Sequence, residues 1–80
     1  MNKVILTAGQ ATIISLFKLY QNHPLSTFDF RREGIASPSQ DIARLKSKGA
    51  IIEASYQNAF CESGKLHKRV AHYSFNGWAN

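Results

Sequence analysis

The spacing of apolar residues changes once along this chain, at Gly49, and that change constrains the fold more than any other feature. Before Gly49, apolar residues recur at intervals of three to four, the spacing of helices that bury one face. After it, apolar and polar residues alternate, which is typical of strands that bury one side. The sequence therefore predicts an α+β fold, in which three helices precede a two-stranded antiparallel β-hairpin.

Local signals delimit the first helix, which we predict over residues 8–22. Thr7 and Gln10 have the spacing of a capping box, in which each side chain bonds the backbone amide of the other residue. Pro24 ends the helix, because the residue before a proline is disfavoured in helical geometry. We expect the buried face to consist of Ile13, Ile14, Leu16, Phe17 and Tyr20.

A second, shorter helix is predicted to end at Gly34, where a left-handed residue is favoured after a helix. Ser26 or Thr27 can cap its beginning, and Asp29 is well placed for the positive helix N-terminus. Residues 24–26 before it are extended and can form a short third strand. We expect the side chains that this helix adds to the core to be Phe28 and Phe30.

The third helix, predicted at about residues 38–48, has the clearest boundaries. Ser37 is an N-cap, Pro38 occupies the first helical position, and Gln40 has the spacing to complete a capping box. Gly49 follows its last turn. The residues that share one side of its helical period, and must face the core, are Ile42 and Leu45.

The opposite side of this third helix is small and polar, so it can approach a DNA groove closely. Gln40 can pair with an adenine edge, and Arg44 with a guanine edge or a phosphate. The hydroxyls of Ser39 and Ser47, the amides capped by Ser37, and Lys48 at the flank are further candidate DNA contacts. The alternative is a solvated face, on which Arg44 pairs only with Asp41 three residues away.

The alternating part of the chain predicts strands at about residues 50–57 and 70–75, joined by a polar, basic loop at residues 61–65. Their alternation points Tyr56, Tyr73 and Phe75 inward, as part of the core. We expect residues 1–6 and 76–80 to be loosely ordered tails, the second of them pinned by Trp78.

The positive charges gather in two segments. The net charge is +5, and eight of the ten Lys and Arg lie between Arg31 and Lys48 or between Lys65 and Arg69. A hairpin that reaches over a DNA backbone needs such charge, because each neutralised phosphate releases counterions. The candidate phosphate contacts are Lys65, His67, Lys68 and Arg69 in the hairpin and Arg31 and Arg32 in the second helix. The alternatives are a β-edge protected by lysines and a plain exposed helix face.

Length and composition exclude several other classes of protein. Eighty residues predict a single domain over residues 1–80, and no stretch has the length and hydropathy of a membrane span or a secretion signal. The single cysteine suits a reducing compartment, so we expect a cytoplasmic protein without disulfides. Cys61, His67 and His72 lack the spacing of zinc ligands, and no catalytic motif is present. We therefore expect no metal, no cofactor and no enzymatic activity.

From Thr7 to Phe75 the chain resembles the small winged helix-turn-helix proteins common in bacteriophages and prophages. The matching stretches are Thr7 to Tyr20, Pro24 to Thr27, Gly34-Ile35, Ser37-Pro38, Ile42 to Gly49, Ile52-Glu53 and Val70 to Tyr73. The resemblance implies a recognition helix in the major groove of double-stranded DNA, a basic wing on the backbone, and a regulatory role in transcription, replication or recombination. Specific binding would require a homodimer or an assembly on adjacent sites, in the cytoplasm of a bacterial host and near its nucleoid.

One departure from the family pattern concerns the third helix. The pattern has arginine at the position of Asp41 and glutamate at that of Arg44, so the base preference of the family does not carry over. Two other functions stay open from the sequence. One is a protein-interaction module that uses Phe60, Trp78 and the face of the first helix, and the other is RNA binding.

Overall fold

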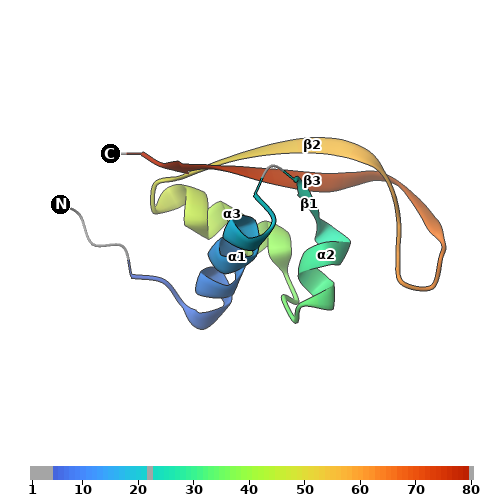
Figure 1. Cartoon of the computed structure of the whole chain (residues 1–80), viewed down its shortest axis with the longest axis horizontal. Helices are drawn as coiled ribbons and strands as arrows, with labels where there is room; N and C mark the ends of the chain where they lie inside the picture. The colour runs from blue at the N-terminus through green and yellow to red at the C-terminus, as the bar shows by residue number, and fades with distance from the viewer. Residues whose placement is uncertain (1–4, 22, 80) are drawn as a thin grey trace.

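The computed structural model of the chain describes residues 5–21 and 23–79 (Figure 1). Its elements, in chain order, are α1 (Ala8–Leu19), β1 (Leu25–Ser26), α2 (Thr27–Arg32), α3 (Pro38–Ser47), β2 (Ala50–Phe60) and β3 (Leu66–Trp78). Three helices followed by a long hairpin confirm the predicted α+β architecture, and β1 confirms the short third strand. Among the described residues, no helix has both the length and the apolar character needed to cross a membrane.

The three strands form one antiparallel sheet in the order β1-β3-β2. β1 pairs Leu25 with Tyr73, and β2 pairs with β3 along almost its whole length, from Ala50 opposite Trp78 to Phe60 opposite Leu66. The helices lie on one side of this sheet, with α1 nearer the viewer than α3 in Figure 1. The core therefore lies between the helices and the inner face of the sheet.

Helix α1 begins with the predicted capping box, because Thr7 and Gln10 exchange side-chain-to-amide hydrogen bonds of 3.2 Å. It ends at Leu19, earlier than predicted. Tyr20 leaves helical geometry at φ −108° and is 47% exposed, so its predicted place in the buried face is wrong. The predicted helix end at residue 22 lies outside the described residues.

Helix α2 is capped by Ser26, whose hydroxyl accepts from the Asp29 amide at 3.2 Å while the Asp29 carboxylate accepts from the Ser26 amide at 2.8 Å. The chain leaves the helix through Gly34, which has the expected positive φ of 91°. Phe30 is fully buried, whereas Phe28 is only half-buried, so the prediction that both fill the core is correct for Phe30 alone.

Aromatic side chains join the helices to the sheet. The rings of Phe17 and Phe30 meet edge to face at 5.4 Å, and Phe17 stacks on Phe75 at 5.6 Å. Ile42 and Leu45 are 3% and 0% exposed, which confirms that they anchor α3 in the core. The outward side of α3 follows from this anchoring.

The end of the chain is more ordered than the sequence predicts. β3 continues through residue 78, and the Ala79 amide donates to the Gly49 carbonyl at 2.6 Å, so residues 76–79 are not a loose tail. Trp78 supports this end by meeting Phe75 edge to face at 5.7 Å. Leu6 also packs against the core, whereas residues 1–4 and residue 80 lie outside the described residues.

The hairpin is longer than the layer of helices beneath it, and Figure 1 shows it passing beyond α2. The molecule consequently measures about 45 × 21 × 21 Å. Ala50 and Ile52 on β2 are buried, but Ala54 is exposed and Tyr56 is 66% exposed. The prediction that Tyr56 belongs to the core is therefore wrong: β2 is an edge strand, and α2 contacts β3 instead.

Candidate nucleic-acid interface

Helix α3 presents an exposed row of polar residues. Because Ile42 and Leu45 point into the core, the helical period turns the other side of α3 to solvent. The predicted site residues that are exposed on α3 and at its two ends are Ser37, Ser39, Gln40, Arg44, Ser47 and Lys48. This surface contains small side chains, two groups able to read bases, and no large apolar residue.

Arg44 remains accessible although it has an acidic neighbour. Its guanidinium lies 3.7 Å from the Asp41 carboxylate, the pair that the alternative interpretation expected. The Arg44 side chain is nevertheless 64% exposed, and an exposed pair of this kind contributes only about 0.2–1 kcal/mol. A phosphate or a guanine edge can therefore replace Asp41 as its partner.

The N-terminus of α3 lacks the predicted capping box. Ser37 has φ −129° and ψ 74°, and its hydroxyl makes no capping hydrogen bond, so the predicted partnership of Ser37 with Gln40 is wrong. With this backbone geometry, the Ser37 carbonyl still accepts from the Asp41 amide at 3.2 Å. Backbone amides in the first turn of a helix have no partner within the helix, and such amides attract anions.

Two of the predicted contacts at the C-terminal end of α3 have partners within the protein. The Ser47 hydroxyl donates to the Arg44 carbonyl at 2.7 Å. The Lys48 ammonium donates to the Ile5 carbonyl at 2.8 Å and also to the side-chain oxygen of Gln10, which is 2% exposed. Lys48 therefore ties the end of α3 to the beginning of α1, a role that its position in sequence does not reveal.

The wing comprises the far end of the β2–β3 hairpin, residues 58–69, and contains a β-bulge. Gln57 pairs with Val70 and Ala59 with His67, so Lys68 and Arg69 together oppose a single residue of β2. Arg69 occupies the left-handed region at φ 58°. A bulge of this kind redirects the side chains at its position. Lys65, Lys68 and Arg69 are all exposed.

The wing contacts helix α2 at two places. The His67 ring lies 5.0 Å from the Phe28 ring, which explains why both are only half-buried. Arg32 lies 3.4 Å from Glu62 in the wing loop and 3.6 Å from Asp29 in its own helix. Arg31 is exposed and has no salt bridge among the described residues. Of the two arginines, Arg31 is therefore the more available to a phosphate.

Cys61 lies at the base of the wing loop, where its sulfur is 3.0 Å from the Ser63 hydroxyl. Hydrogen bonds from Ser63 and then from His67 stabilise the thiolate and lower the pKa of the Cys61 thiol to about 6. Within the described part of the chain, no group of three His, Cys, Asp or Glu side chains has the arrangement of a metal site.

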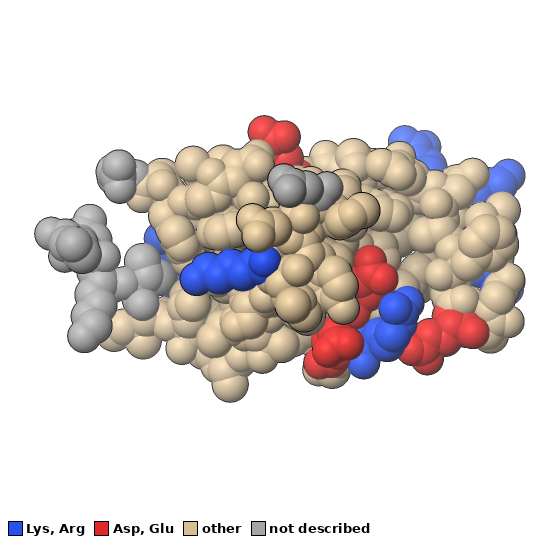
Figure 2. All heavy atoms as spheres, viewed as in Figure 1, with Lys and Arg blue, Asp and Glu red and all other residues tan. Residues whose placement is uncertain are grey.

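Helix α3 and the wing loop both lie on the helix-bearing side of the sheet (Figure 1). Figure 1 shows the hairpin loop bending toward that side, and α3 begins at the end nearer the wing. Figure 2 shows cationic side chains at the end of the molecule that the hairpin forms. A basic extension thus lies beyond the beginning of an accessible polar helix.

Comparison with known families gives one match. A family model described as a winged helix-turn-helix domain matches residues 11–77. This range includes β1, α2, α3, the wing and all but the first three residues of α1. Comparisons with curated proteins and with solved structures give no match.

Proposed function

The chain belongs to the winged helix-turn-helix domain family, and on this basis we propose that it binds double-stranded DNA through α3 and the wing. Domains of this family typically bind DNA and are not enzymes. One observation supports the proposal above all others: α3 buries Ile42 and Leu45 and presents a small, polar row that includes an accessible arginine.

We assign different roles to the two regions of this interface. α3 lies in the major groove, where Gln40 and Arg44 contact bases. The phosphate contacts are Ser37, Ser39, Ser47 and Lys48 around α3, Arg31 and Arg32 on α2, and Lys65, His67, Lys68 and Arg69 in the wing. Lys48 and Arg32 exchange their partners within the protein for phosphates on binding. Phosphate contacts fix the position on the duplex, and base contacts give the sequence preference.

We further propose a regulatory role in a bacteriophage or prophage, in transcription, replication or recombination. The support is the resemblance of Thr7 to Phe75 to proteins of that origin. Two base-reading side chains on one helix give modest specificity, so selective binding requires two copies on adjacent sites. Selection of binding sites from random duplex DNA tests this, because a dimer of two-fold symmetry enriches a palindrome.

A titration of salt, followed by fluorescence anisotropy on labelled duplex DNA, tests DNA binding itself. The logarithm of the association constant should fall linearly with the logarithm of salt concentration, with a slope of about 0.9 for each phosphate contact. An affinity that hardly changes between low and moderate salt would contradict the proposal. Structured RNA, added as a competitor, distinguishes duplex DNA from RNA as the preferred partner.

Three variants separate base contacts from phosphate contacts. Arg44→Ala should reduce the preference for the selected site by about 1–3 kcal/mol. Lys68→Ala should weaken binding to all sequences alike. It should also reduce the salt slope by about 0.9, the value of one phosphate contact. Lys18→Ala removes the same charge from the exposed surface of α1 and serves as the matched control, with binding unchanged.

The second candidate function is a protein-interaction module. The exposure of Phe60 at 66% and of Leu19 at 71% favours it, whereas Trp78 is half-buried against Phe75 and contributes less than expected. Affinity capture from a host lysate, with and without nuclease, separates the two functions. Partners that disappear after nuclease treatment support DNA binding, and partners that persist support a protein contact.

A further inference from the structure

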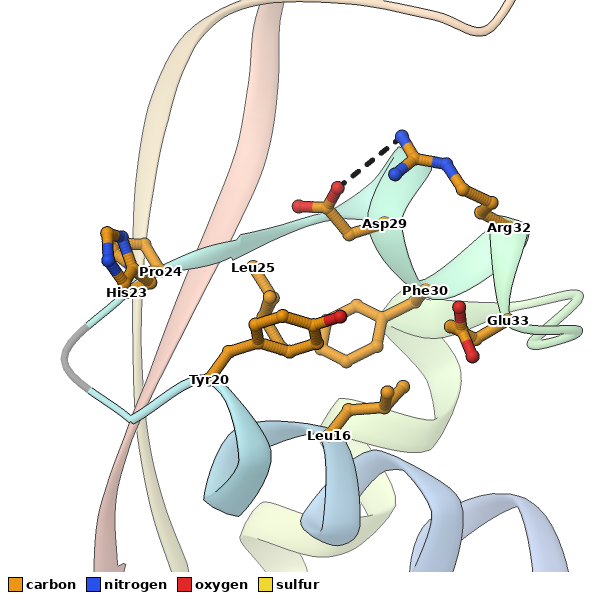
Figure 3. Close-up of a pocket in the computed structure, with 9 residues that line it drawn as sticks. All are labelled: Leu16, Tyr20, His23, Pro24, Leu25, Asp29, Phe30, Arg32 and Glu33. Atoms are coloured by element: carbon orange, nitrogen blue, oxygen red, sulfur yellow. Dashed lines mark ion pairs between the residues drawn. The ribbon is translucent and has the colours of Figure 1, made fainter.

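A notch opens between the end of α1 and helix α2 (Figure 3). It has a volume of about 370 Å³, within the range of pockets that hold ligands. Figure 3 shows its floor, formed by Leu16, Leu25 and Phe30, which are almost completely buried in the core. Tyr20, which is 47% exposed, and the exposed Pro24 line the notch above this floor. The apolar surface that a bulky side chain can cover therefore comes mainly from Tyr20 and Pro24.

The rim of the notch is acidic in a protein that is otherwise basic. Asp29 and Glu33 line the rim, and Arg32 is the one Lys or Arg among the lining residues. Arg32 is shared between Asp29 and Glu62 of the wing loop. Two of the five acidic residues in the chain therefore lie at the rim with a single arginine, and one negative charge of the lining remains uncompensated. Figure 2 shows acidic side chains around a cation on this face of the molecule.

A ligand that matches this notch combines a bulky apolar group with flanking positive charges. The wing of this same protein has that composition, because Leu66 is 46% exposed and lies beside Lys65 and close to Lys68 and Arg69. We propose that the notch binds the wing of a second copy, with Leu66 against Tyr20 and Pro24 and the wing cations against the acidic rim.

The wing of the same chain reaches only the edge of the notch, where Glu62 of its loop meets Arg32. Its His67 ring packs on Phe28 and Leu66 is paired with Phe60 at the end of the ladder, so Leu66 is not among the residues that line the notch. The occupant must therefore come from another molecule. The wing and the notch are different surfaces, so the contact is head-to-tail and extends to a chain of copies rather than closing as a symmetric dimer.

Sedimentation velocity of the DNA-free protein at low salt, over a range of protein concentrations, tests this interface. The weight-average sedimentation coefficient should rise with concentration and return toward the monomer value at high salt, since exposed charges are screened. Glu33→Lys and Lys68→Glu should each weaken self-association about tenfold, because attraction becomes repulsion. Leu66→Ser should weaken it without any change in charge.

An equimolar mixture of Glu33→Lys and Lys68→Glu gives the sharpest result. The first variant keeps a basic wing and the second keeps an acidic notch, so the mixture should associate more strongly than either variant does alone. Glu53→Lys makes the same charge change on the exposed surface of β2 and should associate as the wild type does or more strongly. Far-ultraviolet circular dichroism verifies that each variant is folded.

Several outcomes would overturn the proposal. They are a wild-type protein that stays monomeric, a Glu33→Lys variant that associates normally, and a mixture that fails to recover. If two copies instead paired through the free edges of their β2 strands, Glu33→Lys would associate normally. The self-association test contains no DNA, and Glu33 is outside the proposed DNA interface. If Glu33→Lys loses self-association but still binds DNA, the two proposals are separate, and failure of one does not decide the other.

Discussion

Arg69 combines an unfavourable backbone conformation with an exposed positive charge. It is the one described residue other than glycine that has a positive φ, at 58°. A side chain in this region costs about 1–2 kcal/mol relative to glycine, and such cost is often retained where a side chain has a function. At the bulge of the wing, the function that we propose for Arg69 is contact with a phosphate.

Arg69→Gly should therefore separate stability from DNA binding. Relief of the strained backbone outweighs the greater freedom of glycine in the unfolded chain, and the free energy of unfolding should rise by about 0.5–1 kcal/mol. DNA affinity should fall for all sequences, with a salt slope lower by about 0.9. Urea denaturation and the anisotropy titration measure the two effects on the same preparation.

Lys68→Gly is the matched control, since Lys68 is adjacent, has the same charge and lies outside the left-handed region. Its affinity for DNA should fall by a similar amount, but glycine at a bulge position without a positive φ should lower the free energy of unfolding by about 0.5–1 kcal/mol. Equal stability of the two variants would show that the Arg69 backbone stores no strain.

At the scale of single elements, helices α2 and α3 begin in different ways. Ser26 makes a complete capping box with Asp29, whereas the Ser37 hydroxyl makes no capping hydrogen bond. Both serines precede a helix and have an acidic or amide residue three positions later. The difference lies in the backbone, which is extended at Ser26, at ψ 165°, and reaches only ψ 74° at Ser37.

Ser26→Ala should therefore destabilise the fold and Ser37→Ala should not. Loss of a working N-cap costs about 1 kcal/mol, which lowers the melting temperature of a domain of this size by about 4–8 °C. Ser37→Ala should change the free energy of unfolding by less than about 0.5 kcal/mol. Thermal unfolding followed by circular dichroism measures both, and equal effects would mean that Ser37 caps α3 in solution.

These two helices also show what sequence can predict. The N-cap positions of α2 and α3 and the glycine that follows each helix were predictable, because caps and left-handed glycines depend on a few neighbouring residues. The uncapped hydroxyl of Ser37, like the length of α1, depends instead on how the chain turns between packed elements. The spacing of residues in the sequence does not contain that information.

At the scale of the whole molecule, the features that sequence missed are contacts between distant segments. Lys48 bonds the side chain of Gln10, 38 positions away, and Arg32 meets Glu62 across the gap between helix and wing. The exposure of Tyr56 depends on the place of β2 at the edge of the sheet, beside β3. None of these leaves a periodic or motif signal, although the polar row of α3 was predictable because Ile42 and Leu45 fix it locally.

The molecule as a whole has separated charges, with the basic wing at one end and an acidic notch on the α1–α2 side. Both proposed contacts use the wing, since its cations bind phosphates in one and a neighbouring notch in the other. The same wing cations cannot contact DNA phosphates and a neighbouring notch at once, so DNA and a second copy compete for the wing. This competition couples DNA binding to self-association without any change in fold.

Short duplex DNA should therefore dissociate the assemblies. When labelled protein at an associating concentration is titrated with a duplex just long enough for one copy, its sedimentation coefficient should move toward that of a complex with one protein and one duplex. By linkage, Glu33→Lys, which self-associates about tenfold more weakly, should bind the same duplex more tightly than the wild type at high protein concentration and equally at low concentration. Assemblies that persist with duplex bound along them would show that a docked wing and a DNA-bound wing are compatible.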